Sequence, residues 1–510
     1  MATLRQLSLT GSRPPRVSTT LNTGRDGANP TSAINRFNHR SRSRPGPLPV
    51  RSSNFGFRIS DFVPQGGTWG LGFRISPSPG LVGWVLGAIL CWPCAAGVPG
   101  AKERADYARE FKEQLIQKVM PYWYDLAVDQ QNGGYILSDD AARKAPPARE
   151  KQIVTQARMV WGFSHAHLKG LGDGRRDYLR AAQQGYRFLL DHFLDQERGG
   201  YYWTTDLTGQ PLDQRKLVYG ESFVIYAMVE YYRASGDRGA LTNALELYRL
   251  LQLRAHDAEH EGWLEHFQRD WAPILDPKAQ AIVEVAGRKS ANTHLHLMEA
   301  LTELYEATRD PAVRDSLAEA VRINCTWFYP KNAGQSCFHR HLDWKPATEP
   351  SSAGLSYGHN VEFAWLMVRA QQVLGQRPAW DHFEAHLQHA LKYGFDHERG
   401  GLYSRGVDDR PASDTEKIWW VQAEMLAALT DALKHKESRA YGEALDKLLA
   451  FLQAHQINPS DGIWLESVNA DGTPRSSAKA HNWKANYHDV RAIVKFVEAF
   501  GPAVVGTGGR

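Results

Sequence analysis

Three short motifs that lie far apart in the sequence carry side chains able to move protons. They span residues 292–296 (NTHLH), 357–362 (YGHNVE) and 483–488 (WKANYH). An imidazole with a pKa of about 6.5 gains and loses protons at neutral pH. Two imidazoles on opposite faces of a carbon beside a carbonyl can remove its proton from one face and return a proton to the other. These motifs, which show no evident metal cage, therefore predict proton abstraction next to a carbonyl.

The two histidines of the first motif do not point the same way. His294 and His296 are two residues apart, which places them about 200° apart around a helix. They cannot readily share one metal ion at that angle. We expect one of them to face a central site and the other to pack or hydrogen-bond structurally.

The second motif pairs an imidazole with a carboxylate. His359 and Glu362 are three residues apart and share a helical face. A carboxylate beside an imidazole raises its basicity and fixes its tautomer. A surface ion pair is the alternative, but the run that follows, 363–366 (FAWL), is too apolar for a surface helix. His488 lies near the end of the chain, so it can face His359 only if the helices close into a ring.

A repeat along the chain predicts such a ring. Short loops of glycine and aromatic residues recur 61–72 residues apart, marked by Gly134, Gly200, Gly262, Gly334, Gly401 and Gly462. The copy at Gly334 is the weakest because it lacks the paired glycines. A period of this size holds two helices and their connections. We therefore predict an all-α fold, a closed toroid of six helical hairpins or (α/α)6 barrel, with short β-hairpins in the loops at one end.

Apolar residues recur at helical spacing in the segments that would form this toroid. The segments are 109–127, 153–171, 177–193, 217–232, 241–253, 291–307, 313–328, 361–373, 380–393, 418–433, 441–454 and 487–500. If alternate helices form an inner ring, the six that follow the glycine loops bring their N-terminal ends to one mouth.

Those N-terminal ends are rich in polar and aromatic side chains. They carry Arg158, Trp161, Tyr219, Glu221, Asn292, His294, His296, Tyr357, His359, Glu362, Trp419, Trp420, Gln422, Glu424, Trp483, His488 and Arg491. Helix capping explains single polar residues at such positions, but it does not explain four histidines and four tryptophans. We therefore predict the functional site at this mouth.

Composition separates a leader from the folded body. The 510 residues are 42% hydrophobic and include 16 Trp, a density that fills a core or lines a concave sugar site. The net charge of +4 is uneven, because residues 1–100 contain eleven Arg and two Asp, about +9, which leaves about −5 for the rest. The basic balance therefore belongs to the leader.

We expect three parts: a disordered leader (1–100), a barrel (101–502) and a flexible tail (503–510). The leader is rich in Arg, Ser, Pro and Gly, which cannot bury enough apolar surface to fold. A nucleic-acid-binding arm is the alternative reading of it. Its apolar segment 81–96 resembles a signal peptide and is too short for a confident membrane span. Cys325 and Cys337 are expected to be buried thiols rather than a disulfide.

A sugar fits the predicted chemistry. Aldoses hide their carbonyl as a ring hemiacetal, so a third acid/base group is needed to open the ring, and His296 can supply it. Arg158, Asn292 and Tyr219 would then hold O1 and O2 and stabilise the charge of the enediolate.

The same motifs, with 419–424 (WWVQAE), resemble the N-acylglucosamine 2-epimerase superfamily and within it the cellobiose 2-epimerases. The resemblance covers residues from about 101 to 500 and implies an (α/α)6 barrel without metal or other cofactor. It implies His359 and His488 as the acid/base pair, His296 as the ring-opening group and Glu362 as the residue that tunes His359. It also implies sugar contacts from Arg158, Tyr219, Asn292 and Glu424, with Trp420 and Trp483 stacking on sugar rings. Ala485-Asn486 departs from the Cys-Pro of the pattern, which leaves the substrate open.

The expected activity is interconversion of reducing-end glucose and mannose in cellobiose-type β-1,4-disaccharides through an enediolate. Alternatives are an N-acylglucosamine 2-epimerase, a mannose-type aldose-ketose isomerase, an inverting glycoside hydrolase using Glu221, Glu362 or Glu424, and a non-catalytic carbohydrate-binding toroid. We expect a small sugar as partner, with no nucleic acid and no membrane in the mature form, and a monomer or homodimer. The resemblance implies a cytoplasmic protein; export follows if 81–96 is a signal peptide.

Overall fold

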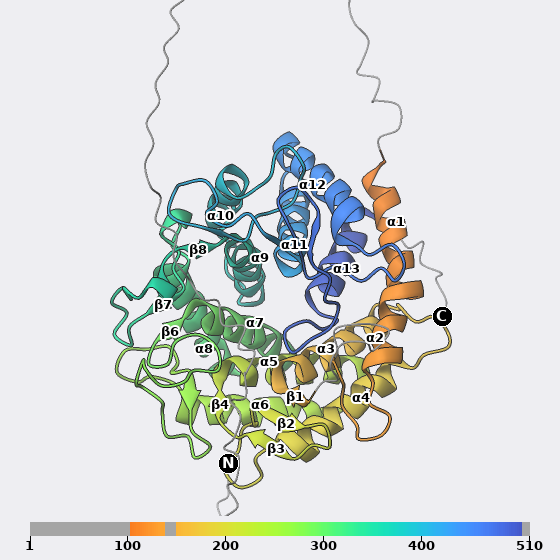
Figure 1. Cartoon of the computed structure of the whole chain (residues 1–510). Helices are drawn as coiled ribbons and strands as arrows, with labels where there is room; N and C mark the ends of the chain where they lie inside the picture. The colour runs from red at the N-terminus through yellow and green to blue at the C-terminus, as the bar shows by residue number, and fades with distance from the viewer. Residues whose placement is uncertain (1–101, 138–148, 502–510) are drawn as a thin grey trace, which may run out of the picture. The chain divides into compact units, whose positions relative to one another are not determined.

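The predicted helices form two concentric rings (Figure 1). The computed structural model describes residues 102–137 and 149–501. Six helices form the inner ring: α3 (Ile153–Leu168), α5 (Val218–Ser235), α7 (Ala291–Thr308), α9 (Tyr357–Val373), α11 (Trp419–His435) and α13 (His488–Phe500). The all-α barrel is confirmed for this part of the chain.

Each inner helix has an outer partner. The outer ring contains α1 (Arg104–Gln114), which continues through a π-helical turn (Leu115–Val119) into α2 (Met120–Ala127), then α4 (Tyr178–Phe188), α6 (Arg238–Arg254), α8 (Pro311–Ile323), α10 (Trp380–Tyr393) and α12 (Arg439–Phe451). Further π-helical turns at Leu189–Phe193, Asn324–Phe328 and Leu452–Gln456 extend α4, α8 and α12. The predicted segments match these helices within a few residues at most ends.

Burial explains why the two rings differ in sequence. The inner helix α5 is buried without interruption from Val218 to Tyr231, because it packs against neighbours on every side. The outer helix α6 buries only one stripe, at Ala240, Ala244, Leu247, Tyr248 and Leu251. Apolar periodicity therefore distinguishes inner from outer helices along the chain.

The ring closes where the last inner helix meets the first. Gly162 of α3 lies against the carbonyl oxygen of Asn486, so close that a Cβ at position 162 would be 2.2 Å from that oxygen. The Arg158 guanidinium lies 4.9 Å from the centre of the Tyr487 ring. Outside this seam α1 packs on α13, with the rings of Phe111 and Phe496 at 5.9 Å. These contacts place the start and the end of the described chain side by side, as Figure 1 shows.

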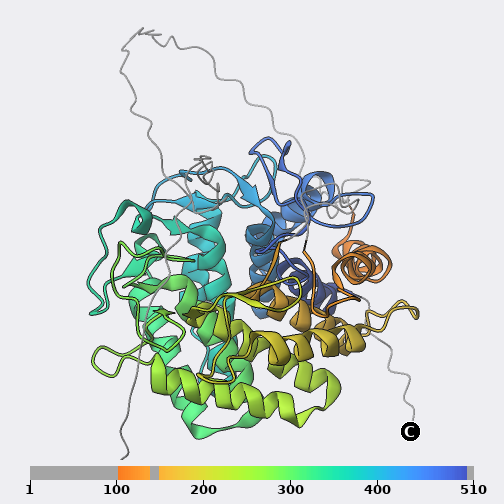
Figure 2. The ribbon, with the colours of Figure 1, turned by 60° about the horizontal axis from the view of Figure 1, so that its bottom comes forward.

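Short antiparallel strands join neighbouring hairpins between the helices (Figure 2). A strand before an inner helix pairs with a strand that follows the next outer helix. The strands are β1 (Glu150–Gln152), β2 (Thr204–Asp206), β3 (Pro211–Asp213), β4 (Lys216–Leu217), β5 (His266–Phe267), β6 (Lys289–Ser290), β7 (His339–Arg340), β8 (Leu355–Ser356), β9 (Arg405–Gly406), β10 (Lys417–Ile418), β11 (Ser467–Val468) and β12 (Pro474–Ser476). They form two three-stranded sheets, β1–β2–β3 and β10–β11–β12, and three two-stranded sheets, β4–β5, β6–β7 and β8–β9.

Backbone conformation explains why most of these loops contain glycine at the marker position. Gly134, Gly200, Gly262, Gly401 and Gly462 have φ between 63° and 87°, where glycine is favoured. Gly334 does not share this conformation and lies in a 3-10 turn (Ala333–Gln335) instead. The weakest copy of the repeat is thus also structurally different.

Four of the loops contain an ion pair that was not predicted from the sequence. An aspartate five residues before the marker glycine accepts hydrogen bonds from backbone N–H groups of its own loop. A lysine two residues before the next inner helix reaches it, in the pairs Asp129–Lys151, Asp195–Lys216, Asp257–Lys289 and Asp396–Lys417, at 2.8–3.2 Å. Each pair connects a loop to the segment just before an inner helix, and so it stabilises the position of the loop at this mouth of the barrel.

The leader, its apolar segment 81–96 and the tail from 502 onward lie outside the described residues. Among the helices of 102–137 and 149–501, none is long and apolar enough to cross a membrane. Cys325 and Cys337 are free and only partly buried.

Candidate active site

The three predicted histidines lie at the N-terminal ends of inner helices. His296 is near the start of α7, His359 is in the first turn of α9 and His488 begins α13. Serine side chains cap two of these helices: Ser290 accepts from the Thr293 N–H and Ser356 from the His359 N–H. Local capping therefore sets where the helices start and which turn carries each imidazole.

Arg491 connects carboxylates from three helices at this mouth. Its Nη2 donates to Glu362 Oε1 at 2.9 Å and to Glu424 Oε1 at 2.8 Å. Its Nη1 donates to Glu299 and, at 2.6 Å, to the hydroxyl oxygen of Tyr487. A buried arginine with several carboxylate partners holds them in a fixed arrangement. The network thus links α7, α9, α11 and α13 beneath the histidines.

Glu424 orients His488. Its Oε1 lies 2.7 Å from His488 Nδ1, and its Oε2 accepts from the Trp365 indole N–H at 3.0 Å. A proton on Nδ1 that donates to this carboxylate leaves the lone pair on Nε2. Protein groups contact both oxygens of Glu424, and its expected contact with the sugar stays a prediction.

Glu299 orients His296 in the same manner. Glu299 Oε2 lies 2.8 Å from His296 Nδ1, and its Oε1 accepts from the Tyr487 hydroxyl at 2.8 Å. The His296 ring packs against Phe223, with centroids 4.8 Å apart. Glu299 was not among the predicted site residues, although its i,i+3 spacing from His296 is the same as that of Glu362 from His359.

His294 has a structural role. Its Nδ1 bonds the Ser290 carbonyl at 2.9 Å and its Nε2 accepts from the Trp263 N–H at 3.2 Å. The two histidines of this motif thus have the different surroundings that their spacing predicts.

The expected hydrogen bond between Glu362 and His359 is absent. Glu362 Oε1 bonds Arg491, and neither Glu362 Oε2 nor His359 Nδ1 has a hydrogen-bond partner among the described residues. The His359 ring lies against Trp420 instead, with centroids 4.7 Å apart. A buried guanidinium attracts the carboxylate more strongly than a neutral imidazole does, so the shared helical face did not determine the pairing.

Two of the predicted sugar-contacting residues, Arg158 and Tyr219, lie beside His296. Arg158 Nη2 donates to the Tyr219 hydroxyl oxygen at 3.2 Å, and Arg158 Nη1 to the Trp483 carbonyl at 3.3 Å. The Tyr219 ring lies 5.6 Å from that of His296. These groups provide hydrogen-bond donors and aromatic surface on one side of the mouth.

Glu284 is a member of this group that the sequence did not reveal. It accepts from the Asn292 side chain at 3.0 Å through Oε1 and contacts His339 Nε2 at 2.8 Å through Oε2. Its φ of 60° is a strained value for a non-glycine residue. Burial raises the pKa of its carboxyl, but His339 and Asn292 outweigh burial and lower the pKa to about 2. No motif or spacing marks this residue, because it reaches the site from a long loop.

Burial controls the protonation of the proposed C2 bases. Burial, together with nearby His296, lowers the pKa of His359 to about 4. It lowers the pKa of His488 to about 3, against the opposing effect of Glu424. Both rings are therefore predominantly neutral at pH 7, which is the form that accepts a proton.

Several other residues at the inner-helix ends bind the loops rather than face the site. Gln156, Glu221 and Gln422 each occupy the fourth position of their helix and accept the backbone N–H of Tyr135, Tyr201 and Leu402, at 2.7–2.9 Å. One oxygen of Glu221 is therefore engaged by the loop, and the other, Oε2, has no hydrogen-bond partner among the described residues.

Glu362, Glu424 and His488 bring potential metal ligands within 4.8 Å of one another. Arg491 already bonds both carboxylates, so a cation would have to displace its guanidinium. Oxygens of Glu362 and Glu424 are closer than the about 6.5–9.5 Å between the carboxyl groups of an inverting glycoside hydrolase, so these two residues do not fit as its catalytic pair.

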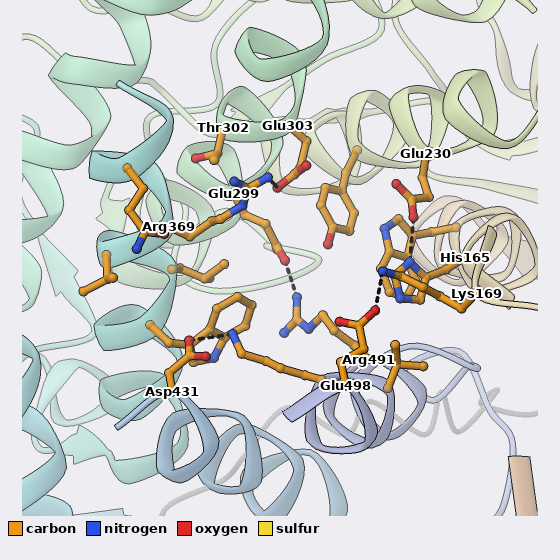
Figure 3. Close-up of a pocket in the computed structure, with 18 of the residues that line it drawn as sticks. His165, Lys169, Glu230, Glu299, Thr302, Glu303, Arg369, Asp431, Arg491 and Glu498 are labelled. Atoms are coloured by element: carbon orange, nitrogen blue, oxygen red, sulfur yellow. Dashed lines mark hydrogen bonds and ion pairs between the residues drawn. The ribbon is translucent and has the colours of Figure 1, made fainter. Parts of the chain in front are cut away.

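A cavity of about 1020 Å³ lies at the opposite mouth, among the C-terminal halves of the inner helices (Figure 3). A hydrogen bond, His165–Glu230, and three ion pairs, Arg233–Glu303, Lys495–Asp431 and Lys169–Glu498, connect residues around it, each at 2.6 Å. Arg491 and Glu299 line this cavity and also bond the site residues, so they form the boundary between the two mouths. The imidazoles proposed to act on the sugar lie on the other side of that boundary.

The paired helical rings and the imidazole–carboxylate pairs at one mouth define a carbohydrate isomerase of the (α/α)6-barrel class. The chain belongs to the N-acylglucosamine 2-epimerase family, whose sequence profile matches residues 133–492. It is 29% identical over 393 residues to a cellobiose 2-epimerase of Bacteroides fragilis, covering 76% of this chain and 98% of that one. A D-mannose isomerase of Marinomonas mediterranea is 24% identical over 402 residues, with 77% and 97% covered. The solved cellobiose 2-epimerase of Spirochaeta thermophila superposes with a TM-score of 0.69 at 30% identity, covering 78% of this chain and 97% of its own.

Proposed function

We propose that this sugar 2-epimerase acts on the reducing-end residue of a β-1,4-linked disaccharide such as cellobiose, and that His359 and His488 exchange the C2 proton. The observation that carries the proposal is the position of Trp420. Its ring lies 4.7 Å from that of His359 and 5.9 Å from that of His488, so both imidazoles lie beside one aromatic side chain at the mouth. The cellobiose 2-epimerases among the relatives support the choice of substrate.

The reaction begins with ring opening, for which His296 is the proposed base. The open-chain aldehyde makes the C2 proton acidic, and a neutral imidazole from one face removes it. Arg158, Tyr219 and Asn292 hold O1 and O2 and stabilise the negative charge of the enediolate.

The opposite imidazole then delivers a proton to the other face of C2. This step requires that one of the two rings is protonated when the other takes the C2 proton. Glu424 stabilises an imidazolium at His488 through the 2.7 Å contact with Nδ1 and so opposes the effect of burial. His488 is therefore the proposed proton donor when His359 is the base, with the roles reversed for the opposite epimer.

An aldose-ketose isomerase is the second candidate, supported by the relative with D-mannose isomerase activity. Isomerisation uses the same enediolate and differs only in protonation at C1 rather than C2. The two activities therefore differ in product and not in the residues they require.

Incubation of the purified protein with cellobiose, followed by NMR of the products, tests the proposal. We expect a new disaccharide with a mannose-type reducing end. A ketose product identifies the isomerase, free glucose identifies a hydrolase, and turnover of N-acetylglucosamine in place of cellobiose identifies the N-acyl epimerase. Each of these three results would replace the proposal.

A further inference from the structure

The cavity at the opposite mouth is separate from the groups proposed to act on the sugar. Its volume of about 1020 Å³ is at the upper end of the range for ligand-binding pockets, ~300–1,000 Å³. Side chains from all six inner helices line it (Figure 3). A space of this size can hold a small molecule, and the lining side chains determine which kind of molecule fits.

The charged groups of the lining largely neutralise one another. The cavity is lined by six Lys or Arg and five Asp or Glu side chains. Five of the six cations form ion pairs, and Lys434 is the one without an acidic partner in the described part of the chain. An ionic ligand would have to compete with these pairs. The lining therefore favours a ligand without net charge.

Two buried aromatic side chains offer uncharged hydrogen-bond groups to this cavity. Tyr226 and Trp161 line it and are only 7% and 3% exposed. Neither the Tyr226 hydroxyl nor the Trp161 indole N–H has a hydrogen-bond partner among the described residues. Their rings stack at 5.5 Å, which fixes both groups in place. Buried polar groups are ordinarily paired, so the occupant of the cavity must supply an acceptor for the indole N–H.

Thr302 adds the complementary requirement. Its hydroxyl donates to the Met298 carbonyl at 2.7 Å, so the Thr302 oxygen is free only to accept a further hydrogen bond. An occupant that satisfies Trp161 must accept, and one that satisfies Thr302 must donate. A hydroxyl group does both. The Trp380 ring, which stacks on His435 at 3.8 Å, adds aromatic surface on which the C–H groups of a sugar can pack.

We propose that the opposite cavity is a second carbohydrate-binding site, which takes an uncharged disaccharide. Hydroxyl groups of this sugar pair with Tyr226, Trp161 and Thr302, and the ion pairs around the cavity stay intact. The cavity volume matches a molecule of this size. The site is distinct from the mouth that carries the imidazoles, so the inference does not depend on the proposed function.

Binding of methyl β-cellobioside to the full chain tests the proposal. This glycoside is uncharged and has no free anomeric hydroxyl, so it cannot be turned over. We expect the wild-type protein to bind one more molecule per chain than Thr302→Trp, whose indole fills the cavity. Tyr226→Phe removes the unpartnered hydroxyl and should weaken this binding event ~2- to 10-fold, the range of one hydrogen bond. Titration calorimetry measures the number of sites and their affinities, and a crystal soaked with the glycoside locates them.

Tyr231→Phe is the matched control. Tyr231 lies on the same helix as Tyr226, but its ring stacks on Tyr186 at 4.7 Å and it is not a lining residue of the cavity. This variant should bind the glycoside as the wild-type protein does. If circular dichroism shows that Thr302→Trp is unfolded, the comparison of Tyr226→Phe with Tyr231→Phe decides the test.

Two kinds of result would overturn the inference. The first is an equal number of bound glycosides in the wild-type protein and a folded Thr302→Trp variant, or equal affinities in Tyr226→Phe and Tyr231→Phe. The second is binding of inorganic phosphate in the cavity that Lys434→Ala abolishes, without binding of the glycoside there. That result would identify a site for an anion.

Discussion

His359 and His488 differ in how they are held, although they are proposed to act on the same carbon. His488 is anchored to Glu424, whereas His359 packs on Trp420 and its Nδ1 has no partner among the described residues. The sequence predicted both imidazoles from motif and spacing. It could not predict that Glu424 binds His488 or that Arg491 binds Glu362, because in each pair the two residues come from different helices.

Single substitutions of His359 and His488 should show that each imidazole acts on a different face of C2. We expect His359→Ala and His488→Ala each to reduce epimerisation by ~10²- to 10⁴-fold, since each removes one proton-transfer group. Each variant should still exchange the C2 proton with D2O in one epimer only, and the preferred epimer should differ between them. NMR of the glucose-type and mannose-type disaccharides in D2O measures this. Near-wild-type epimerisation in both variants would contradict the two-base mechanism.

Glu424→Gln tests the stabilisation of the His488 imidazolium. The carboxylate raises the pKa of His488 against burial, so its removal lowers that pKa further. A shift of ~1–3 units, typical of a neighbouring charge, reduces the protonated fraction at pH 7 by ~10- to 10³-fold. We expect kcat to fall correspondingly and its pH optimum to move to lower pH. Glu303→Gln, in the opposite cavity, is the control. An unchanged pH optimum in Glu424→Gln would contradict the stabilisation of the His488 imidazolium by Glu424.

At the scale of helices and loops, the inner helices and their glycine loops follow from the sequence period. The period did not predict the aspartate–lysine pair in four loops. A single charged residue in a loop is normally expected to be exposed to solvent, and these residues become buried only when the loop folds over them. A sequence pattern that could have predicted the pair was present. In these four units the aspartate is always five residues before the marker glycine, and the lysine is always two residues before the inner helix. The fourth unit lacks the lysine, having Leu355 two residues before α9, and its loop differs.

Removal of one of these aspartates should destabilise the fold. Asp396→Asn leaves the fully buried Lys417 ammonium without its anion, which costs about 3–5 kcal/mol of unfolding free energy. Glu384→Gln breaks a longer, exposed contact with Lys436 and should cost less than ~1 kcal/mol. Urea unfolding of both variants provides the comparison. Equal losses would mean that the buried pair contributes no more than a surface pair.

At the scale of the whole described unit, the site exists only because the ring closes. His488 and Arg491 belong to the last inner helix, and they reach groups from the earlier inner helices across the lumen. Sequence periodicity predicted closure, but one of the contacts at the seam, Gly162 against Asn486, depends on a close approach of two backbone segments that no local pattern encodes. Closure is therefore a tertiary property on which the chemistry depends.

Gly162→Ala tests the importance of this seam. The new methyl group would be 2.2 Å from the Asn486 carbonyl oxygen, so α3 and the segment before α13 must move apart. We expect a loss of stability of about 1–3 kcal/mol, typical of overpacking, together with reduced epimerisation. Gly172→Ala is the control because a Cβ there meets nothing within 4 Å. Thermal unfolding and epimerisation assays measure the two effects. A Gly162→Ala protein that is as stable and as active as Gly172→Ala would show that close contact between α3 and the segment before α13 is not required.

The most direct test of proton exchange at C2 is wild-type turnover of cellobiose in D2O, followed by NMR of the reducing-end residue. We expect a mannose-type product that carries deuterium at C2, because the proton returns from a protein group that equilibrates with solvent. A mannose-type product that retains the original hydrogen at C2 in every turnover would contradict exchange between two bases. So would a product labelled at a carbon other than C2.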